Sequence, residues 1–388
     1  MYPKIQPSYD AIREIDIGKK QRRMYFIGCS IGSFISVYVR RVITLQESTG
    51  FNDCISKFEK PWFFTILMSL GMSFGLAVHK IILLFQSKDS IVNVSFSHVD
   101  PKCYLLAFIP ALGDIFYSVG FTFSIVTNGH SFAVALRFFD ILFIPIIRCF
   151  YLRKKMLPYS TIAIALLTIG IFMVSGSYLW DFIKENDGNT INVKNAFAAI
   201  FQIFSQAVFA VKVITEEKLL HQNDLPPLIL CGIEGLYEVV IVVFCCCTVL
   251  YFIPSSANVF NTENLCDTFL MVIHSKPLIA FVVVYPFVSL IFNNCAMGII
   301  MMENAVAFTV NETIVTSFVW FCDIFIYYVI KNYTIGSQWR YSSILHLVGI
   351  IFIIFGALLY TKAIRLPHFK YETANVVVIK IEEGHHSI

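Results

Sequence analysis

The sequence predicts an all-α polytopic membrane protein whose ten transmembrane helices form two inverted five-helix repeats. The first observation is composition: 57% of the residues are hydrophobic and 14% are charged, whereas typical globular domains are about 25% charged. The second is that apolar segments of about 20 residues, the length needed to cross a bilayer, recur along the chain. The third is that two very short linkers, 127–130 and 301–304, occupy equivalent places in the two halves.

Hydropathy and the polar linkers divide the chain into ten expected spans. They cover residues 24–44, 61–85, 104–127, 131–151, 158–180, 193–214, 227–252, 277–300, 305–330 and 342–363. We therefore expect four regions: an N-terminal tail (1–23), a first repeat (24–180), a second repeat (193–363) and a C-terminal tail (364–388).

The two halves follow the same plan. Each ends in a hairpin, made of a helix that contains polar residues and a mainly apolar helix that contains glycine. Because five is an odd number, the second half enters the membrane from the opposite side to the first. Many secondary transporters are built in this way and bind their solute near the midplane, between the repeats.

Basic residues predict the orientation of the chain. Lysine and arginine gather in the N-terminal tail, in the 153–157 linker and in the C-terminal tail. Cytosolic loops carry an excess of these residues, so we expect both tails in the cytosol, although Arg40 and Arg41 near the outer end of the first span count against it. The N-terminus lacks a signal-peptide pattern, and the first span is expected to act as an uncleaved signal anchor.

Several kinds of function find no support in the sequence. A net charge of +3 without a basic stripe argues against a nucleic-acid partner. Catalytic motifs are missing, so we do not expect an enzyme. No cysteine or histidine cluster has metal-ligand spacing, so neither a metal nor a cofactor is expected. Most of the 11 cysteines lie within spans, but Cys54 and Cys266 fall in non-cytosolic loops and could form a disulfide.

Six short segments, in order, resemble a known family. They are "PALGD" (110–114), "SFAVALR" (131–137), "EEK" (216–218), "GIEG" (232–235), "KPLIA" (276–280) and "FGALLY" (355–360). The chain resembles the F subfamily of solute carrier family 35, an EamA-type group of the drug/metabolite transporter superfamily. It is distantly similar to the chloroquine-resistance-transporter-like proteins. The resemblance covers roughly residues 24–364.

This resemblance implies a ten-helix transporter that works by alternating access. The central cavity would be formed by spans 1–4 and 6–9, with spans 5 and 10 outside it as a scaffold. The resemblance also implies an endomembrane location, first of all the lysosomal or vacuolar membrane, with the Golgi, mitochondrial and plasma membranes as alternatives. One departure is Lys212, which stands where relatives tend to carry an uncharged amide.

Charged side chains inside the third and fourth spans are the first candidates for the solute path. A charge at the centre of a bilayer costs at least about 2.5–3.5 kcal/mol, so such a residue usually has a function. Asp114 and Ser118 are four residues apart on one helix face, and Arg137 and Asp140 are three apart. Arg137 is the strongest candidate, as an anion-binding or gating residue. Two structural alternatives remain open: a closed Arg137–Asp140 ion pair, and Asp114 as the counter-ion of Arg137.

The seventh span carries two carboxylates, Glu234 and Glu238, on one face. Like charges repel, so at least one of them is expected to hold a proton when buried, which would make a proton site. The alternative is that Glu234 reaches out to the cytosolic surface. Lys212 and Glu216, four residues apart, are interpreted as an interfacial salt bridge at a helix end.

The eighth and ninth spans supply the remaining cavity candidates. They are Asn293, Asn294, Asn311 and Glu312. Glu312 is the natural counterpart of Arg137, because the ninth span is the repeat-mate of the fourth. Asp323 lies nearer the outer end of the ninth span and is expected to be solvated.

Together these patterns predict a secondary active transporter that moves a small organic solute across an endomembrane. Proton coupling through Glu234, Glu312 or Asp114 is one possibility within this prediction. The alternative is a membrane scaffold or receptor that keeps the transporter fold without transporting. The sequence leaves open the identity of the solute and the oligomeric state.

Overall fold

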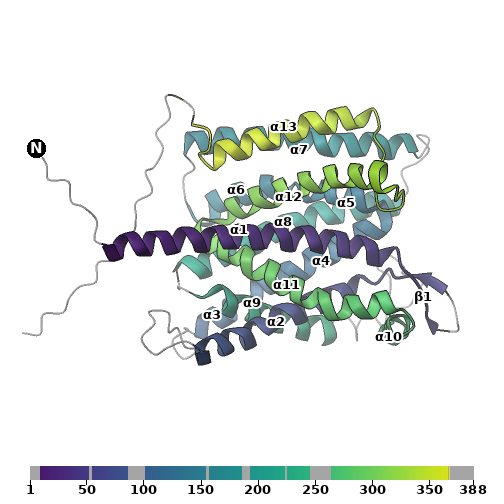
Figure 1. The fold of residues 1–388 in the computed structure, drawn as a ribbon, viewed down its shortest axis with the longest axis horizontal. Coiled ribbons are helices and arrows are strands. Elements are labelled where there is room, and N and C mark those ends of the chain that lie inside the picture. The colour runs from purple at the N-terminus through teal and green to yellow at the C-terminus, as the bar shows by residue number, and fades with distance from the viewer. Residues whose placement is uncertain are drawn as a thin grey trace, which may run out of the picture.

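The computed structural model describes residues 9–51, 55–85, 101–153, 157–185, 193–222, 225–244, 264–365 and 367. This part of the chain is helical apart from one small antiparallel hairpin, formed by β1 (Glu47–Thr49) and β2 (Ile55–Lys57). The long helices run side by side (Figure 1). We call the end that carries this hairpin the hairpin end, and the opposite end, where α1 begins and α13 finishes, the tail end.

The first half of the chain contains seven helices among the described residues. They are α1 (Tyr9–Thr44), α2 (Pro61–Phe85), α3 (Pro101–Leu106), α4 (Phe108–Asn128), α5 (His130–Arg137), α6 (Asp140–Tyr151) and α7 (Pro158–Glu185).

The second half contains α8 (Val193–Gln222), α9 (Pro227–Ile241), α10 (Leu265–Ile273), α11 (Lys276–Met302), α12 (Ala305–Phe325) and α13 (Ser342–Tyr360). A short π-helix, η6 (Ile326–Ile330), continues α12. Within the described residues, nine helices are long and apolar enough to cross a membrane. The chain is therefore a polytopic helical protein. The end of the predicted span 227–252 lies outside the described residues.

The fourth predicted span is not the single helix that we expected over 131–151. It is divided into α5 and α6 by Phe138 and Phe139. At the break the backbone tightens, because Phe139 N–H bonds to Leu136 O and Ile141 N–H bonds to Phe138 O. Irregular backbone at membrane depth is tolerated where it is buried in protein, and Phe138 is buried here. Hydropathy detects the length of an apolar run but not this interruption.

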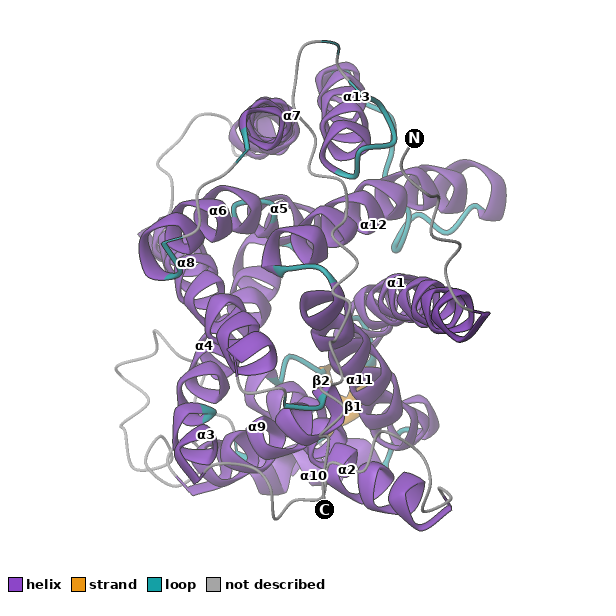
Figure 2. Cartoon of the chain, turned by 90° about the vertical axis from the view of Figure 1, so that its left-hand side faces the viewer, coloured by secondary structure: helices purple, strands orange, loops and turns teal. Residues whose placement is uncertain are grey.

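Helices α7 and α13 pack against each other and lie to one side of the others (Figures 1 and 2). Glycine makes their close contact possible. A Cβ on Gly170 would lie 2.6 Å from Gly349 O, and a Cβ on Gly349 would lie 2.7 Å from Gly170 O. Small residues at helix crossings let two backbones approach closely in membrane proteins.

We expect Gly170→Ala to lower the free energy of unfolding by about 1–3 kcal/mol, because the new methyl group overpacks a backbone–backbone crossing. Thermal unfolding of the detergent-solubilised protein measures the change. Gly176→Ala is the matched control on the same helix, since a Cβ there meets no atom within 4 Å, and it should melt like the parent protein. Equal melting temperatures for the two variants would contradict the packing described here.

Candidate functional site

A small cavity of about 60 Å³ lies between the two halves of the chain. Its walls come from α1, α2, α4, α5, α6, α8, α11 and α12. Helices α7 and α13 supply none of the residues that line it. The space holds only a few water molecules, and charged and aromatic side chains line it.

One ion pair crosses this cavity from α5 to α12. Arg137 Nη2 lies 3.0 Å from Glu312 Oε2, and the two side chains are only 11% and 7% exposed. Glu312 also accepts hydrogen bonds from Ser33 Oγ at 2.8 Å and from Cys29 Sγ at 3.7 Å, both on α1. The carboxylate of Glu312 therefore ties α1 and α5 of the first half to α12 of the second.

A second buried ion pair joins α4 to α8. Lys212 Nζ lies 2.8 Å from Asp114 Oδ2 and 3.4 Å from Glu216 Oε1. The close approach of α4 and α8 depends on Gly113, because a Cβ there would lie 2.8 Å from Lys212 Cβ. Two interpretations of the sequence are corrected. Asp114 is the partner of Lys212 and not of Arg137, and the buried Lys212–Glu216 contact does not mark a helix end, because α8 continues to Gln222.

Asp140 does not form the ion pair with Arg137 that the sequence left open. Arg137 turns to Glu312, while Asp140 begins α6 on the other side of the helix break. Asp140 is buried, and its Oδ1 has no hydrogen-bond partner among the described residues. The three-residue spacing would place the two side chains together only in a continuous helix.

The other candidates from the sequence divide into two groups. Asp114, Arg137, Asp140, Asn293 and Glu312 line the cavity, and Ser118, Glu234, Asn294 and Asn311 do not. Ser118 instead accepts a hydrogen bond from Thr65 Oγ1 at 3.0 Å, and Asn311 Oδ1 accepts one from Ser30 Oγ at 3.1 Å.

Glu234 and Glu238 are completely buried where α9 crosses α2, so Glu234 does not reach the surface. Gly235 allows this crossing, because a Cβ there would lie 2.7 Å from Ser69 O. Ser69 Oγ donates to Glu238 Oε2 at 2.7 Å, whereas neither oxygen of Glu234 has a hydrogen-bond partner among the described residues. Both carboxyl groups act electrostatically on Lys212.

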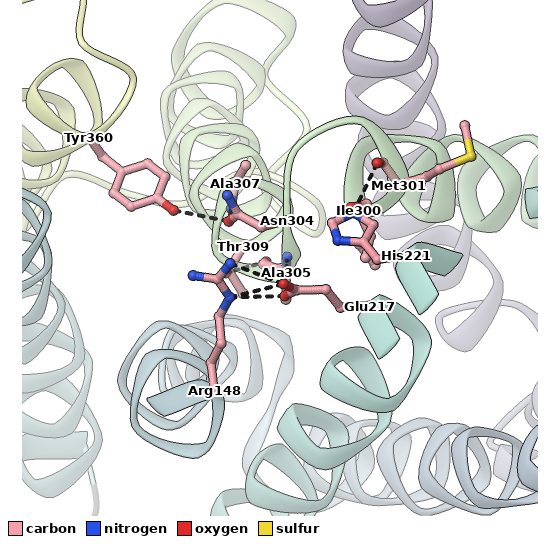
Figure 3. A network of polar contacts seen from close by, with 10 residues as sticks. All are labelled: Arg148, Glu217, His221, Ile300, Met301, Asn304, Ala305, Ala307, Thr309 and Tyr360. Atoms are coloured by element: carbon pink, nitrogen blue, oxygen red, sulfur yellow. Dashed lines mark hydrogen bonds and ion pairs between the residues drawn. The ribbon is translucent and has the colours of Figure 1, made fainter. Parts of the chain in front are cut away.

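At the tail end, a polar network joins α6, α8, α11 and α12 (Figure 3). Arg148 donates from Nε and Nη2 to both oxygens of Glu217, at 3.0–3.1 Å. Glu217 also accepts from the N–H of Ala305, at 3.1 Å. His221 Nε2 donates to Ile300 O and Met301 O, at 3.0 Å each.

The sequence did not single out this network. Arg148 falls within the fourth expected span, 131–151, but nothing in the sequence pairs it with Glu217, which lies 69 residues further along the chain. The available signal was that Arg148, like Arg137, is a basic residue within an apolar segment and therefore needs a counter-charge.

At the hairpin end, Arg41 on α1 pairs with Asp323 on α12 at 2.8 Å. Tyr38 donates to the same carboxylate at 2.8 Å. Asp323 is 5% exposed, so the expectation of a solvated Asp323 is wrong. Arg41 and Tyr38 on α1 cover the Asp323 carboxylate. The position of Asp323 near the end of a span does not predict this cover. A larger cavity of about 490 Å³ opens beside this contact, between α5, α7, α12 and α13.

Outside the spans, Lys60 and Asp267 join the two halves again at 2.6 Å. Asp267 Oδ1 also accepts from the N–H of Phe51 at 2.7 Å. Burial acts to raise the pKa of Asp267, but the Lys60 ammonium and the Phe51 N–H outweigh it and hold this pKa below its usual value. Cys54 lies outside the described residues and Cys266 is exposed, so their disulfide stays a prediction.

Comparisons with known proteins bear on this arrangement. No family model matches the chain. It is 24% identical over 310 residues to solute carrier family 35 member F6 of Rattus norvegicus and of Mus musculus, and each alignment covers 78% of both chains. A solved crystal structure without a functional description shares the fold, with a TM-score of 0.51 and 10% identity over 87% of this chain and 99% of that one.

These similarities support a place for the chain in solute carrier family 35 and the drug/metabolite transporter superfamily. Both of these relatives are named as solute carriers. The helical bundle and the charged cavity between its halves agree with that assignment.

Proposed function

We propose that the protein is a secondary active transporter that moves a small organic solute across an endomembrane by alternating access. The observation that carries the proposal is that buried ion pairs join the first half to the second at three levels. Arg148–Glu217 lies at the tail end, Arg137–Glu312 at the central cavity and Arg41–Asp323 at the hairpin end. Contacts at both ends of a cavity can act as gates when the halves rock against each other.

The proposal includes ten crossings in two inverted repeats, 24–180 and 193–363, with both tails in the cytosol. Helices α5 and α6 together would form the tenth crossing. The packing supports the inverted repeat, because α1 packs on α11 and α4 packs on α8. In a repeat of five spans, α1 corresponds to α8 and α4 corresponds to α11. The α1–α11 contact is therefore the repeat equivalent of the α8–α4 contact. Helices α7 and α13, which would be exchanged for each other, form one pair.

The gates would open one at a time. A buried charge that loses its partner costs about 3–5 kcal/mol of free energy. Opening both ends at once would leave two pairs broken, so a state with both ends open is strongly disfavoured. With both tails cytosolic, the network of Figure 3 would close the cytosolic side. The Arg41–Asp323 pair would close the other side. In this structure both end pairs are formed, so opening either side requires one pair to separate while the other stays closed.

Proton coupling is proposed from the charges around Lys212. Four buried carboxyl groups, those of Asp114, Glu216, Glu234 and Glu238, act on this one ammonium group. A buried charge without a counter-ion is costly, so protons are the available means of neutralising the surplus. Binding and release of such a proton as Lys212 changes partner would couple solute movement to a pH gradient. We place the protein in the lysosomal or vacuolar membrane, where such a gradient exists.

Solute exchange in proteoliposomes tests the function. Purified protein is reconstituted, and uptake of radiolabelled amino acids, peptides, nucleotides and organic cations is measured with and without a pH gradient. We expect saturable uptake of one class above protein-free liposomes, accelerated by the gradient. Gly176→Ala should behave like the parent protein. A panel without any uptake would contradict transport and leave the scaffold or receptor alternative.

A further inference from the structure

Arg40 on α1 is a buried cation that faces the central cavity. Its residue exposure is 7%, equal to that of its neighbour Arg41. The two differ in their partners. Arg41 has the carboxylate of Asp323 at 2.8 Å, whereas no carboxylate of the described residues lies within 4.0 Å of the Arg40 guanidinium. Arg137, Arg148 and Lys212 each have a carboxylate at 2.8–3.0 Å.

The hydrogen-bond partners that the described residues offer Arg40 are all neutral. Nε donates to Tyr285 Oη at 2.7 Å, Nη1 reaches Thr122 Oγ1 at 3.5 Å, and Nη2 reaches Met68 Sδ at 3.7 Å. A guanidinium carries five N–H donors. One N–H donor therefore makes a short hydrogen bond and two make long ones. The remaining N–H donors of the guanidinium can bind another acceptor.

Aromatic rings surround the same guanidinium. Its carbon lies 6.0, 5.9 and 5.7 Å from the ring centroids of Phe64, Phe121 and Tyr285. Rings at this distance attract a cation but do not neutralise it. The Phe121 ring also lies 5.2 Å from the guanidinium carbon of Arg137, so a ligand on Arg40 would be one ring away from the Arg137–Glu312 pair.

We propose that Arg40 binds the anionic group of the transported solute, a carboxylate or a phosphate, and that the solute is therefore a small organic anion. The planar fork of arginine matches both groups through two parallel hydrogen bonds. Apolar side chains, Phe209, Phe292 and Phe308 among them, also line the cavity, and they would contact an apolar body behind the anionic group once the two halves separate and the cavity widens. This inference rests on the proposed transport function and specifies its substrate class.

The binding test uses four probes of nearly equal size: benzoate, phenyl phosphate, the neutral benzamide and the cation benzylammonium. Isothermal titration calorimetry on the full chain in lipid nanodiscs should show saturable binding of benzoate or phenyl phosphate, and none of the other two. Which anion binds distinguishes carboxylate from phosphate. Arg40→Gln should weaken the affinity for that anion at least tenfold. Arg40→Lys keeps the charge but not the planar guanidinium, and its affinity should lie between those of the parent protein and Arg40→Gln.

The stability test needs no ligand. Arg40→Gln removes a charge without a counter-ion, so its melting temperature should equal or exceed that of the parent protein. Arg41→Gln, at the next position and equally buried, leaves Asp323 unpaired and should melt several degrees lower. An equal loss in both variants would show that the protein itself balances Arg40, and would overturn the proposal. Failure of the Arg40→Gln variant to fold would likewise show that the fold needs the Arg40 charge, and it would also overturn the proposal.

Uptake of the same probes into proteoliposomes separates this inference from the proposed function. Anion binding that depends on Arg40 without any uptake would retain the anion site and contradict transport. Uptake of benzamide or benzylammonium alone would retain transport and overturn the anion site. Absence of binding by both anions, or equal binding by the Arg40→Gln variant, would also overturn it.

Discussion

Replacing Arg137 with Gln is expected to abolish solute uptake and to lower the free energy of unfolding by about 3–5 kcal/mol. The substitution leaves the Glu312 carboxylate buried without its cation, and an uncompensated buried charge has a cost of this size. Uptake in proteoliposomes and thermal unfolding in detergent measure the two effects. Arg22→Gln is the control, because the Arg22–Glu303 side chains are 51% and 29% exposed and such pairs contribute about 0–1 kcal/mol.

A double variant separates folding from function. Arg137→Met combined with Glu312→Leu replaces the buried pair by apolar groups, which is often neutral for stability. We expect the melting temperature to recover in this variant while uptake stays absent. Recovery of both would mean that the pair only holds α5 to α12. A single Arg137→Gln variant that melts and transports like Arg22→Gln would contradict any role for the pair.

Replacing Glu234 with Gln is expected to remove the dependence of uptake on the pH gradient while leaving the melting temperature unchanged or slightly higher. Glu234 is fully buried and neither of its oxygens has a hydrogen-bond partner among the described residues. A neutral amide of the same shape therefore loses little there, but it cannot carry a proton. Uptake is compared at equal pH on both sides and with an imposed gradient.

Glu217→Gln is the matched control for this experiment. Glu217 is also fully buried, but its carboxylate is held by Arg148 and by the Ala305 N–H. We expect this variant to lose about 3–5 kcal/mol of unfolding free energy, because the Arg148 cation is left without its partner. If uptake by Glu234→Gln still followed the gradient, the proton site would have to be assigned elsewhere.

Much of the architecture could be predicted from the sequence because the bilayer imposes a simple rule. Each crossing needs about 20 apolar residues, so the helices appear as apolar runs bounded by linkers such as 153–157. The glycines of the GIEG segment (232–235) are small residues of the kind that let helices approach closely, and the structure shows such an approach at Gly235. The break between α5 and α6 escaped this reasoning, because Phe138 and Phe139 are as apolar as the helices around them.

The candidate site was only partly predictable. Hydropathy marks Asp114, Arg137 and Glu312 as costly residues in spans, which is why they were identified. Arg148 and Arg40 carry the same cost, but their places near the ends of the first and fourth spans concealed it. Asp323 was expected in solvent for the same reason. Position along a span gives the depth of a residue, but it does not say which helix covers it.

The sequence by itself determined that the chain is a helical membrane protein with charges inside its spans, because the cost of burying backbone and charge in hydrocarbon depends on residue type alone. Only the tertiary structure decided which charges meet. Lys212 pairs with Asp114 and Arg137 pairs with Glu312, whereas Arg40 hydrogen-bonds to the neutral hydroxyl of Tyr285. Ion pairs form over a few ångströms between helices distant in the sequence, so their partners are set by helix packing and not by spacing along the chain.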